Sequence, residues 1–466
     1  NNHQLLEGYF GVVQARAIVM PLNVRLSPLE LINILNHSGA RMLIFENDFA
    51  PLVEQLKPAC RQLERFVTIN DKVPVADLTY EELIDKGYPQ RADIFDFDEL
   101  AVAELFYTSG STGTPKGVML GNRTLYLHAL DASSVYKDVD SMVDLHTIPL
   151  FHANGWGRPQ TATMNGIKQV MVRRFDPPGV LRLIQEERAT AMSLVPTMAN
   201  ALLNFPDLSR YDVSSLKEIH IGGAAASPDL IRRMEETFHC FVMAGYGLTE
   251  TSPVATSARH KGTVQFGDEQ DRLRRMAMAG WPMPGCEVRV VDAQMRDVPR
   301  DMQSIGEIVV RGDLVMDGYY KEPETTRAVI TDHWLHTGDM AVWDEENFVH
   351  IVDRKKDIII SGGENISSIE LEKWISMHPA VLECAVVAAP DPKWGEVPAA
   401  VVSLKPGQKL TCEELLTFLE GQLAKFKLPR LMEFVEGPLP KTGTGKILKR
   451  ELRETFWAGK ERRVQG

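Results

Sequence analysis

Apolar residues recur along the chain in patterns that predict helices followed by short buried strands. A capping box formed by Ser27 and Glu30, with Pro28 at the first helical position, marks the start of a helix. Gly39 marks its end, because glycine readily adopts the left-handed conformation that closes a helix. The apolar run Met42–Phe45 then predicts a strand.

The same order recurs in the middle of the chain. A helix at 178–188 is expected to lead into a strand at 192–195, and a helix starting at Ser227 separates strands at 219–221 and 240–243. Alternation of this kind is typical of a largely parallel sheet covered by helices. Ligands of such sheets bind beyond the carboxyl ends of the strands, so we expect the functional site there.

The pattern changes twice towards the C-terminus. Short β-branched runs at 288–291 and 308–310 predict a small β-rich subdomain. Past Val352, helices and strands are expected at 368–377, 383–389, 399–404 and 411–424. We therefore predict an α/β fold with two domains. A large N-terminal domain, 1–352, contains parallel-sheet α/β subdomains and the β-rich subdomain, and a mobile α+β domain follows at 353–466.

The composition narrows the choice of partners and compartment. The 466 residues include 51 Lys and Arg against 63 Asp and Glu, a net charge of −12, which argues against nucleic acid. No apolar run is long enough for a transmembrane segment, and no signal peptide is evident. Five scattered cysteines lack metal-ligand spacing and favour a cytoplasmic protein. The chain begins without Met, so an N-terminal segment is expected to be missing.

The densest group of polar residues directly follows the apolar strand Leu105–Phe106. Tyr107–Gly117 reads YTSGSTGTPKG, in which glycines expose backbone N–H groups among five serine and threonine hydroxyls and one ammonium. Such a loop suits the phosphates of a nucleotide, although it lacks the GxxxxGK[ST] spacing of a Walker A motif. A polar surface loop is the alternative interpretation.

This loop resembles the first signature of the adenylate-forming superfamily, which includes acyl-CoA synthetases, luciferases and the adenylation domains of peptide synthetases. Four further segments resemble later signatures of that family in the right order, at Gly245–Thr251, His336–Asp339, Asp353–Asn365 and Pro440–Lys446. Five ordered motifs could hardly arise by chance. The resemblance is strongest to medium- to long-chain fatty acyl-CoA ligases.

The resemblance implies an ATP- and Mg²⁺-dependent acyl-CoA synthetase that forms acyl-AMP and pyrophosphate, then acyl-CoA and AMP. Its catalytic residues would be Lys446, Glu250 and His152, and Thr108 would join Glu250 as a metal ligand. Fixed cations are needed because a carboxylate and the α-phosphate repel each other. Taken singly, these residues have plainer interpretations: a surface glutamate, a structural histidine and a lysine in a basic loop.

ATP and coenzyme A are expected to contact the remaining motif residues. Tyr246 would lie against adenine, and Asp339 and Arg354 would reach the ribose, although spacing alone allows Asp339 to be a helix N-cap. The expected binding residues are Thr108, Ser109, Gly110, Ser111, Thr112, Gly113, Lys116, Ala153, Gly223, Ala224, Gly245, Tyr246, Gly247, Thr249, Asp339, Arg354, Lys356, Gly362, Gly363 and Asn365.

The family also implies that the C-terminal domain rotates between the two half-reactions. Rotation about the hinge at 353–356 would withdraw the lysine loop, 440–446, and bring the Gly362–Gly363 loop to the site. A homodimer is the expected assembly.

Two residues bear on the acid that is activated. Peptide synthetases place Asp after the Phe that corresponds to Phe151, and His152 stands there instead, so a plain carboxylic acid is expected. Some long-chain enzymes carry Trp where this chain has Asn365, which weakens a strict long-chain preference. Small residues such as Gly155 indicate either room for an acyl group or tight backbone packing. The alternatives are an aryl or cinnamoyl-CoA ligase, an adenylating enzyme with a carrier-protein acceptor and, least favoured, a non-enzymatic nucleotide-binding protein.

Overall fold

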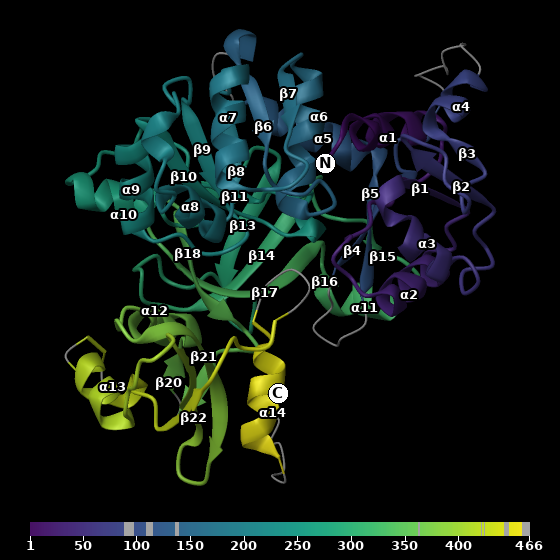
Figure 1. Cartoon of the computed structure of the whole chain (residues 1–466). Coiled ribbons are helices and arrows are strands. Elements are labelled where there is room, and N and C mark those ends of the chain that lie inside the picture. The colour runs from purple at the N-terminus through teal and green to yellow at the C-terminus, as the bar shows by residue number, and fades with distance from the viewer. Residues whose placement is uncertain are drawn as a thin grey trace. The chain divides into compact units, whose positions relative to one another are not determined.

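A computed structural model describes most of the chain. The described residues are 1–87, 97–108, 115–135, 139–361, 364–420, 422–423, 425–441 and 447–458. The chain divides into two units. Unit 1 comprises Asn1–Arg289, Val309–Thr337 and Asp344–Val349. Unit 2 comprises Val290–Ile308, Gly338–Trp343 and His350–Gly466. Both units combine helices with sheets (Figure 1), as the predicted α/β class requires.

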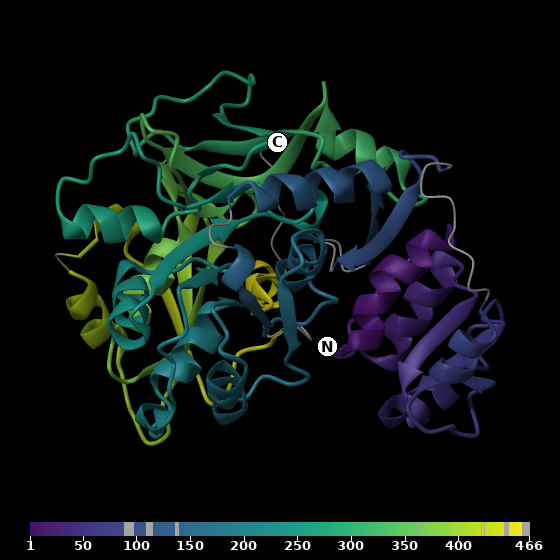
Figure 2. The ribbon, with the colours of Figure 1, turned by 90° about the horizontal axis from the view of Figure 1, so that it is seen from above.

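The N-terminal part of unit 1 is a small parallel sheet with its own helices, drawn in purple to blue in Figures 1 and 2. Its strands are β1 (Met42–Glu46), β2 (Arg65–Ile69) and β3 (Leu78–Thr79). Its helices are α1 (His3–Gln14), α2 (Pro28–Ser38), η1 (Asn47–Phe49), α3 (Ala50–Leu56) and α4 (Tyr80–Asp85). The predicted capping box of Ser27 and Glu30 is present, and Gly39 closes α2 with φ of 73°.

A seven-stranded sheet forms the centre of unit 1. Its strand order is β12-β11-β10-β9-β8-β6-β7. The five strands from β10 to β7 in this order are parallel, and β11 and β12 are antiparallel. The strands are β6 (Val143–His146), β7 (Lys168–Met171), β8 (Ala191–Leu194), β9 (Glu218–Ile221), β10 (Phe241–Tyr246), β11 (Thr256–Ser257) and β12 (Trp281–Pro282). The predicted strands at 192–195, 219–221 and 240–243 are therefore confirmed, with ends that differ by one to three residues.

Helices accompany this sheet, and α5 packs along α6. They are α5 (Asn122–Ser133), η2 (Val139–Ser141), α6 (Ala153–Met164), α7 (Pro177–Glu187), α8 (Pro196–Leu203), η3 (Leu208–Arg210), α9 (Pro228–Phe238), η4 (Thr249–Thr251) and α10 (Glu269–Met276). The side chains of Asp176 and Ser227 cap α7 and α9 by accepting backbone N–H groups. None of the helices in the described part of the chain combines the length and apolar character needed to cross a membrane.

A three-stranded sheet, β15-β5-β4, carries the polar loop predicted to bind phosphate. Its strands are β4 (Val102–Thr108), β5 (Lys116–Gly121) and β15 (Gly318–Tyr319). Because β4 and β5 are antiparallel, Thr108 and Lys116 face each other across the base of the connection between them. The strand predicted at Leu105–Phe106 is thus part of a β-hairpin.

A further sheet contains the β-rich segment that the sequence predicted. Its elements are β13 (Cys286–Val291), β14 (Gly306–Gly312), β16 (Ile330–Thr331), β17 (Trp334–Trp343) and β18 (Val349–Arg354), with α11 (Pro323–Val329) before β16. The β-branched runs at 288–291 and 308–310 lie in β13 and β14. Strands β13, β14, β17 and β18 contribute residues to both units.

The C-terminal part of unit 2 is an α+β structure. Its sheet has the order β20-β19-β22-β21, with β23 beside β22. Its elements are β19 (Ile359–Ser361), β20 (Glu364–Ile366), α12 (Ser368–Ser376), β21 (Val381–Asp391), β22 (Gly395–Leu404), α13 (Cys412–Leu419), η5 (Lys425–Lys427), β23 (Leu431–Val435) and α14 (Lys449–Trp457). The capping box of Thr411 and Glu414 is present. The helix predicted to reach residue 424 ends at Leu419, because Glu420 is already extended and the next residue is glycine.

Candidate active site

Four of the expected nucleotide-binding residues lie at the carboxyl ends of two neighbouring parallel strands. β9 and β10 pair with Ile221 opposite Ala244. Gly223 and Ala224 therefore follow β9 beside the place where Gly245 and Tyr246 end β10. Gly223 has φ of 77°, a conformation that favours glycine. This is the edge of a parallel sheet at which ligands commonly bind.

The turn after β10 requires a glycine at position 247. A Cβ atom on Gly247 would lie 1.7 Å from the carbonyl oxygen of Pro253, closer than any side chain can approach. The buried hydroxyl of Thr251 accepts a hydrogen bond of 2.9 Å from the Leu248 N–H. This close packing fixes the short helix η4, which presents Thr249 and Glu250.

Tyr319 joins Glu250 to the hairpin that carries Thr108 and Lys116. Its hydroxyl donates a hydrogen bond of 2.8 Å to Glu250 Oε1, and the Lys116 Nζ lies 5.0 Å from the centre of its ring. β15 places the tyrosine by pairing Tyr319 with Val118 of β5. Burial, followed by the negative charge of Glu250, raises the pKa of Tyr319 well above its usual value, so the phenol stays a donor.

The sequence motifs did not include Tyr319 or Tyr320, and they gave no role to the side chain of Tyr107. Tyr107 Oη is hydrogen-bonded at 2.7 Å to the His37 ring, and the Tyr320 N–H donates to Gly117 O at 2.7 Å. Together they brace both strands of the hairpin. The signal in the sequence is the Gly-Tyr-Tyr run at 318–320, which follows an apolar segment and lies outside the five motifs.

His152 lies at the start of helix α6. It is the N-cap residue, it is half-buried, and its N–H donates to Pro149 O at 3.0 Å. A Cβ on Gly155 would lie 2.6 Å from Pro149 O, so that small residue serves close backbone packing. Ala153 begins the helix, and its side chain lies outside the described part of the chain.

The residues present fit a magnesium ion that arrives with ATP. The described residues contain no group of three or more His, Cys, Asp or Glu side chains that could hold a metal ion by themselves. Mg²⁺ is usually bound by one or two carboxylates together with substrate phosphates and waters. Glu250 is a half-buried carboxylate of this kind, and Tyr319 orients it.

The expected ribose-binding residues of unit 2 pair with each other. Asp339 Oδ1 accepts from Arg354 Nε at 2.7 Å, and the Lys355 N–H donates to Gly338 O at 2.8 Å. Asp339 lies inside β17, so the helix N-cap alternative is wrong, because the chain there is paired as a strand. Lys356 is exposed in the turn after β18.

Several predicted residues lie outside the part of the chain that the structure describes. The backbone of Asn365 belongs to β20, but its side chain is not among the described groups. The residues outside the described ranges are Ser109, Gly110, Ser111, Thr112, Gly113, Gly362, Gly363 and Lys446.

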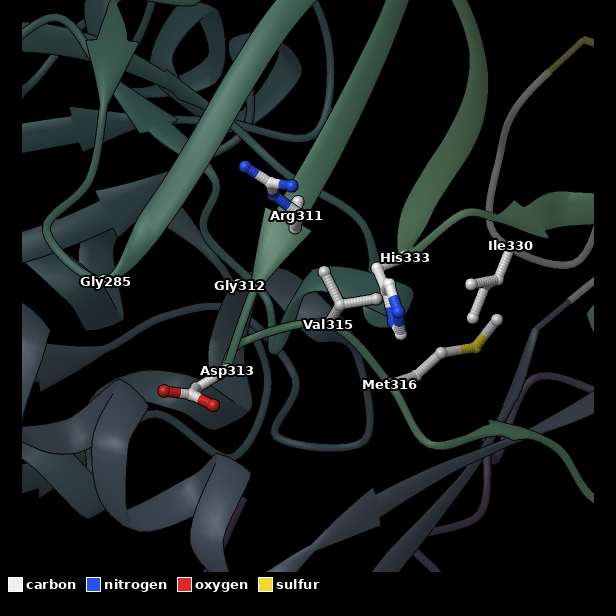
Figure 3. A pocket seen from close by; sticks show the side chains of 8 residues that line it. All are labelled: Gly285, Arg311, Gly312, Asp313, Val315, Met316, Ile330 and His333. Atoms are coloured by element: carbon white, nitrogen blue, oxygen red, sulfur yellow. The ribbon is translucent and has the colours of Figure 1, made fainter.

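A pocket of about 360 Å³ lies beside the end of β14 and the segment that follows it (Figure 3). Its lining residue Met316 donates its N–H to Glu250 O at 3.0 Å. The Arg311 side chain at its rim forms an ion pair with Glu287 and lies over the Trp334 ring. The lining residues are Gly285, Arg311, Gly312, Asp313, Val315, Met316, Ile330 and His333. None of the predicted site residues is among them.

The fold and the order of the site motifs define an adenylate-forming enzyme. Residues 1–320 match the family model described as AMP-binding enzyme, and residues 370–446 match the AMP-binding enzyme C-terminal domain. The chain therefore belongs to the AMP-binding enzyme family, which confirms the resemblance. With relatives that are named CoA ligases, it is an AMP-forming acid–thiol ligase, the predicted class of enzyme.

Individual relatives cover nearly the whole chain. The chain is 41% identical to a long-chain-fatty-acid–CoA ligase of Thermus thermophilus, over 98% of this chain and 84% of that protein. It is 38% identical to a feruloyl-CoA synthase of Amycolatopsis sp, over 98% and 87%. The solved structure of ATP-bound MatB from Rhodopseudomonas palustris matches with a TM-score of 0.84 and 28% identity, over 98% and 87%. These matches confirm the predicted α/β fold class, with a large N-terminal and a separate C-terminal domain.

Proposed function

We propose that this protein is an ATP- and Mg²⁺-dependent acyl-CoA synthetase that activates a carboxylic acid as its adenylate before transfer to coenzyme A. The observation that carries the proposal is the cluster around Tyr319, which links Lys116 and Glu250 beside the hairpin loop that follows Thr108. A cation, an oriented carboxylate and a polar loop are the groups that a triphosphate undergoing substitution requires.

In the first half-reaction, a carboxylate oxygen bonds to the α-phosphorus of ATP while the bond to the departing pyrophosphate breaks. Lys116 and Lys446 offset the negative charge that accumulates between the two anions. Glu250 and Thr108 would hold Mg²⁺, which supplies further charge neutralisation on the phosphates. Tyr319 keeps the Glu250 carboxylate oriented through its hydrogen bond of 2.8 Å.

In the second half-reaction, the coenzyme A thiolate bonds to the carbonyl carbon of the acyl-adenylate, and the C–O bond to AMP breaks. We propose that rotation about residues 353–356 replaces the lysine loop by the Gly362–Gly363 loop between these steps. Asp339 is proposed to bind the ribose, and its ion pair of 2.7 Å with Arg354 holds the buried carboxylate in position to accept hydroxyl hydrogen bonds.

The acid is proposed to be a medium- to long-chain fatty acid, with aryl or cinnamoyl acids as the alternative. His152 in place of an acidic residue supports an acid without an α-amine. The relatives favour neither choice, because one is named for long-chain fatty acids and another for a feruloyl group.

The test is a panel of aliphatic and aromatic acids incubated with MgATP and coenzyme A, with AMP and thioester products identified by mass spectrometry. We expect both AMP and an acyl-CoA to appear with at least one acid, and neither without acid. Acyl-AMP that accumulates without a thioester would instead favour a carrier-protein acceptor. Glu250→Gln is the matched control, since it keeps the size of the side chain but removes its charge.

Light scattering of the same preparation tests the proposed homodimer.

A further inference from the structure

A buried glutamate lies on the strand that leads to the hairpin loop. Glu104 is in β4, four residues before Thr108, and is only 1% exposed. Its Oε1 accepts a hydrogen bond of 3.0 Å from the Gln160 Nε2 of helix α6. Its other oxygen, Oε2, is buried and has no hydrogen-bond partner among the described residues, and the same is true of Gln160 Oε1.

Both oxygens are acceptors, so each needs a proton from a donor, and a proton on Glu104 Oε2 would supply one. A carboxylic acid and a primary amide can form two hydrogen bonds at once: the amide donates to one carboxyl oxygen, and the acid hydroxyl donates to the amide oxygen. An ionised Glu104 would leave two buried acceptors unsatisfied, which is costly in a dry interior. Burial raises the pKa of Glu104 to about 8, against a smaller lowering by the Gln160 amide.

Within the described part of the chain, none of the groups recorded as interacting with Glu104 carries a positive charge. Tyr9 of α1 is the titratable residue that faces it, and burial followed by the charge of Glu104 raises the pKa of that phenol. Leu120 lies opposite Glu104 on β5, and the backbone of Val19 bridges to it from the other side. Together with Gln160 on α6, these contacts bring one phenol, one amide and an apolar side chain to Glu104.

The Glu104–Gln160 pair connects two elements of the candidate site. β4 ends at Thr108, opposite Lys116, and α6 begins directly after His152. Tyr9 supports the same connection, because its hydroxyl donates to Leu150 O at 2.7 Å and its ring stacks on Phe106 of β4. The segment that carries His152 is therefore held to β4 from both ends.

We propose that Glu104 is a neutral carboxylic acid in the working enzyme and a positioning residue, which pairs at two points with Gln160 and so holds His152 in register with the Thr108–Lys116 hairpin. The proposal rests on the proposed function of this site. Ionisation of Glu104 removes the second hydrogen bond and brings a negative charge against the amide oxygen. The α6 helix then loses its alignment with β4, and adenylation slows.

The test compares the wild type with Glu104→Gln, which keeps the shape, neutrality and two-point pairing. We measure pyrophosphate exchange from about pH 6 to about pH 10, which avoids titration of the coenzyme A thiol. The wild-type rate is expected to fall by up to about tenfold per pH unit above about pH 8. The variant should match the wild type within about twofold near neutral pH, and its alkaline fall should begin at least about one unit higher. Glu54→Gln, at an exposed position, is the control and should follow the wild type.

A second variant, Gln160→Met, tests the pairing from the other partner. Gln160→Met loses both the amide N–H and the amide oxygen, so the two-point pairing is broken; the rate near neutral pH should decline, and the alkaline fall should no longer coincide with that of the wild type. An alkaline fall that stays in place in both variants overturns the proposal.

Thermal unfolding provides a measurement that does not depend on activity. The pKa of Glu104 is raised from its ordinary value of 4.5 to about 8, so its contribution to stability is lost as pH rises through that interval. The wild type should therefore lose stability relative to Glu104→Gln as the pH rises from 4.5 to about 8, so the Tm of the variant minus the Tm of the wild type should increase over that pH range. A difference that is independent of pH contradicts the neutral acid even if the enzyme proves to have another activity. Absence of exchange in the wild type alone would contradict only the proposed function.

Discussion

At the scale of single residues, the hydroxyl of Tyr319 determines how Glu250 is presented. Tyr319→Phe removes the hydrogen bond of 2.8 Å and leaves the ring in place. A hydrogen bond to a charged group contributes about 1.5–3 kcal/mol, so kcat/KM for MgATP in pyrophosphate exchange should fall about 10- to 100-fold. Tyr320→Phe is the matched control, because that hydroxyl makes a contact of 3.4 Å with Ser38 O. Equal losses in both variants would contradict the assignment.

Position 247 has no room for any side chain larger than that of glycine. Gly247→Ala would place a Cβ 1.7 Å from Pro253 O, so the turn that carries Glu250 must shift. We expect a loss of unfolding free energy of about 1–3 kcal/mol or more and a large loss of exchange activity. Gly262→Ala is the control, since nothing lies within 4 Å of its added Cβ. Denaturant unfolding and exchange assays measure both effects, and a fully active Gly247→Ala enzyme would refute the steric argument.

The residues of this site differ in whether the sequence alone predicts them. Gly247 and Glu250 were predicted, because they belong to one local motif. Glu104 and Gln160 were not, since they are 56 residues apart and nothing in either neighbourhood indicates that they meet. Glutamate is also seldom fully buried, so the sequence gives no reason to expect Glu104 in the interior. Its position between β4 and α6 becomes evident only from the structure.

At the scale of elements, a chain of polar contacts connects β18, α12 and α14. The Ser368 hydroxyl donates to Asp353 Oδ2 and accepts from Lys449 Nζ, both at 2.6 Å. Lys449 also forms an ion pair of 2.7 Å with Glu372. Because Lys449 follows Lys446 by three residues, this network connects the base of the lysine loop to the start of the proposed hinge.

Lys449→Met should destabilise this part of unit 2. It leaves the largely buried Glu372 without its cation, a change that typically costs about 3–5 kcal/mol in buried pairs and somewhat less at this partial exposure. Arg450→Met is the control, because its ion pair with Glu454 is exposed and contributes about 0–1 kcal/mol. Chemical denaturation followed by tryptophan fluorescence measures both variants. Equal stability of the two would contradict a structural role for the network.

Helix boundaries were predicted correctly where the sequence contains a capping box. Ser27 and Thr411 start helices as predicted, because their capping boxes are local hydrogen-bond patterns. The end of α13 and the secondary structure at Asp339 were not predicted correctly from the sequence. A strand pairing decides the conformation at Asp339, and pairing partners are distant in the sequence.

At the scale of the whole molecule, the proposed rotation separates the two half-reactions. Lys446→Ala should abolish most pyrophosphate exchange, while the attack of coenzyme A on supplied acyl-AMP continues at close to the wild-type rate. The reason is that the ammonium offsets charge only while the carboxylate meets the α-phosphate. Lys441→Ala, five residues earlier, is the control and should affect neither step strongly. Equal loss of both half-reactions in Lys446→Ala would rule out the alternation.

The course of β14, β17 and β18 through both units also limits how this enzyme can be recombined with its relatives. A crossover at residue 353 looks natural, because it precedes the last long segment of unit 2. It would nevertheless draw Asp339 and Glu307 from one parent, and their partners Arg354 and Lys355 from the other. Each ion pair would then be a hybrid. Functional chimeras with a junction there are expected only between parents that share both pairs, or when 290–308 and 338–343 are exchanged together with 350–466.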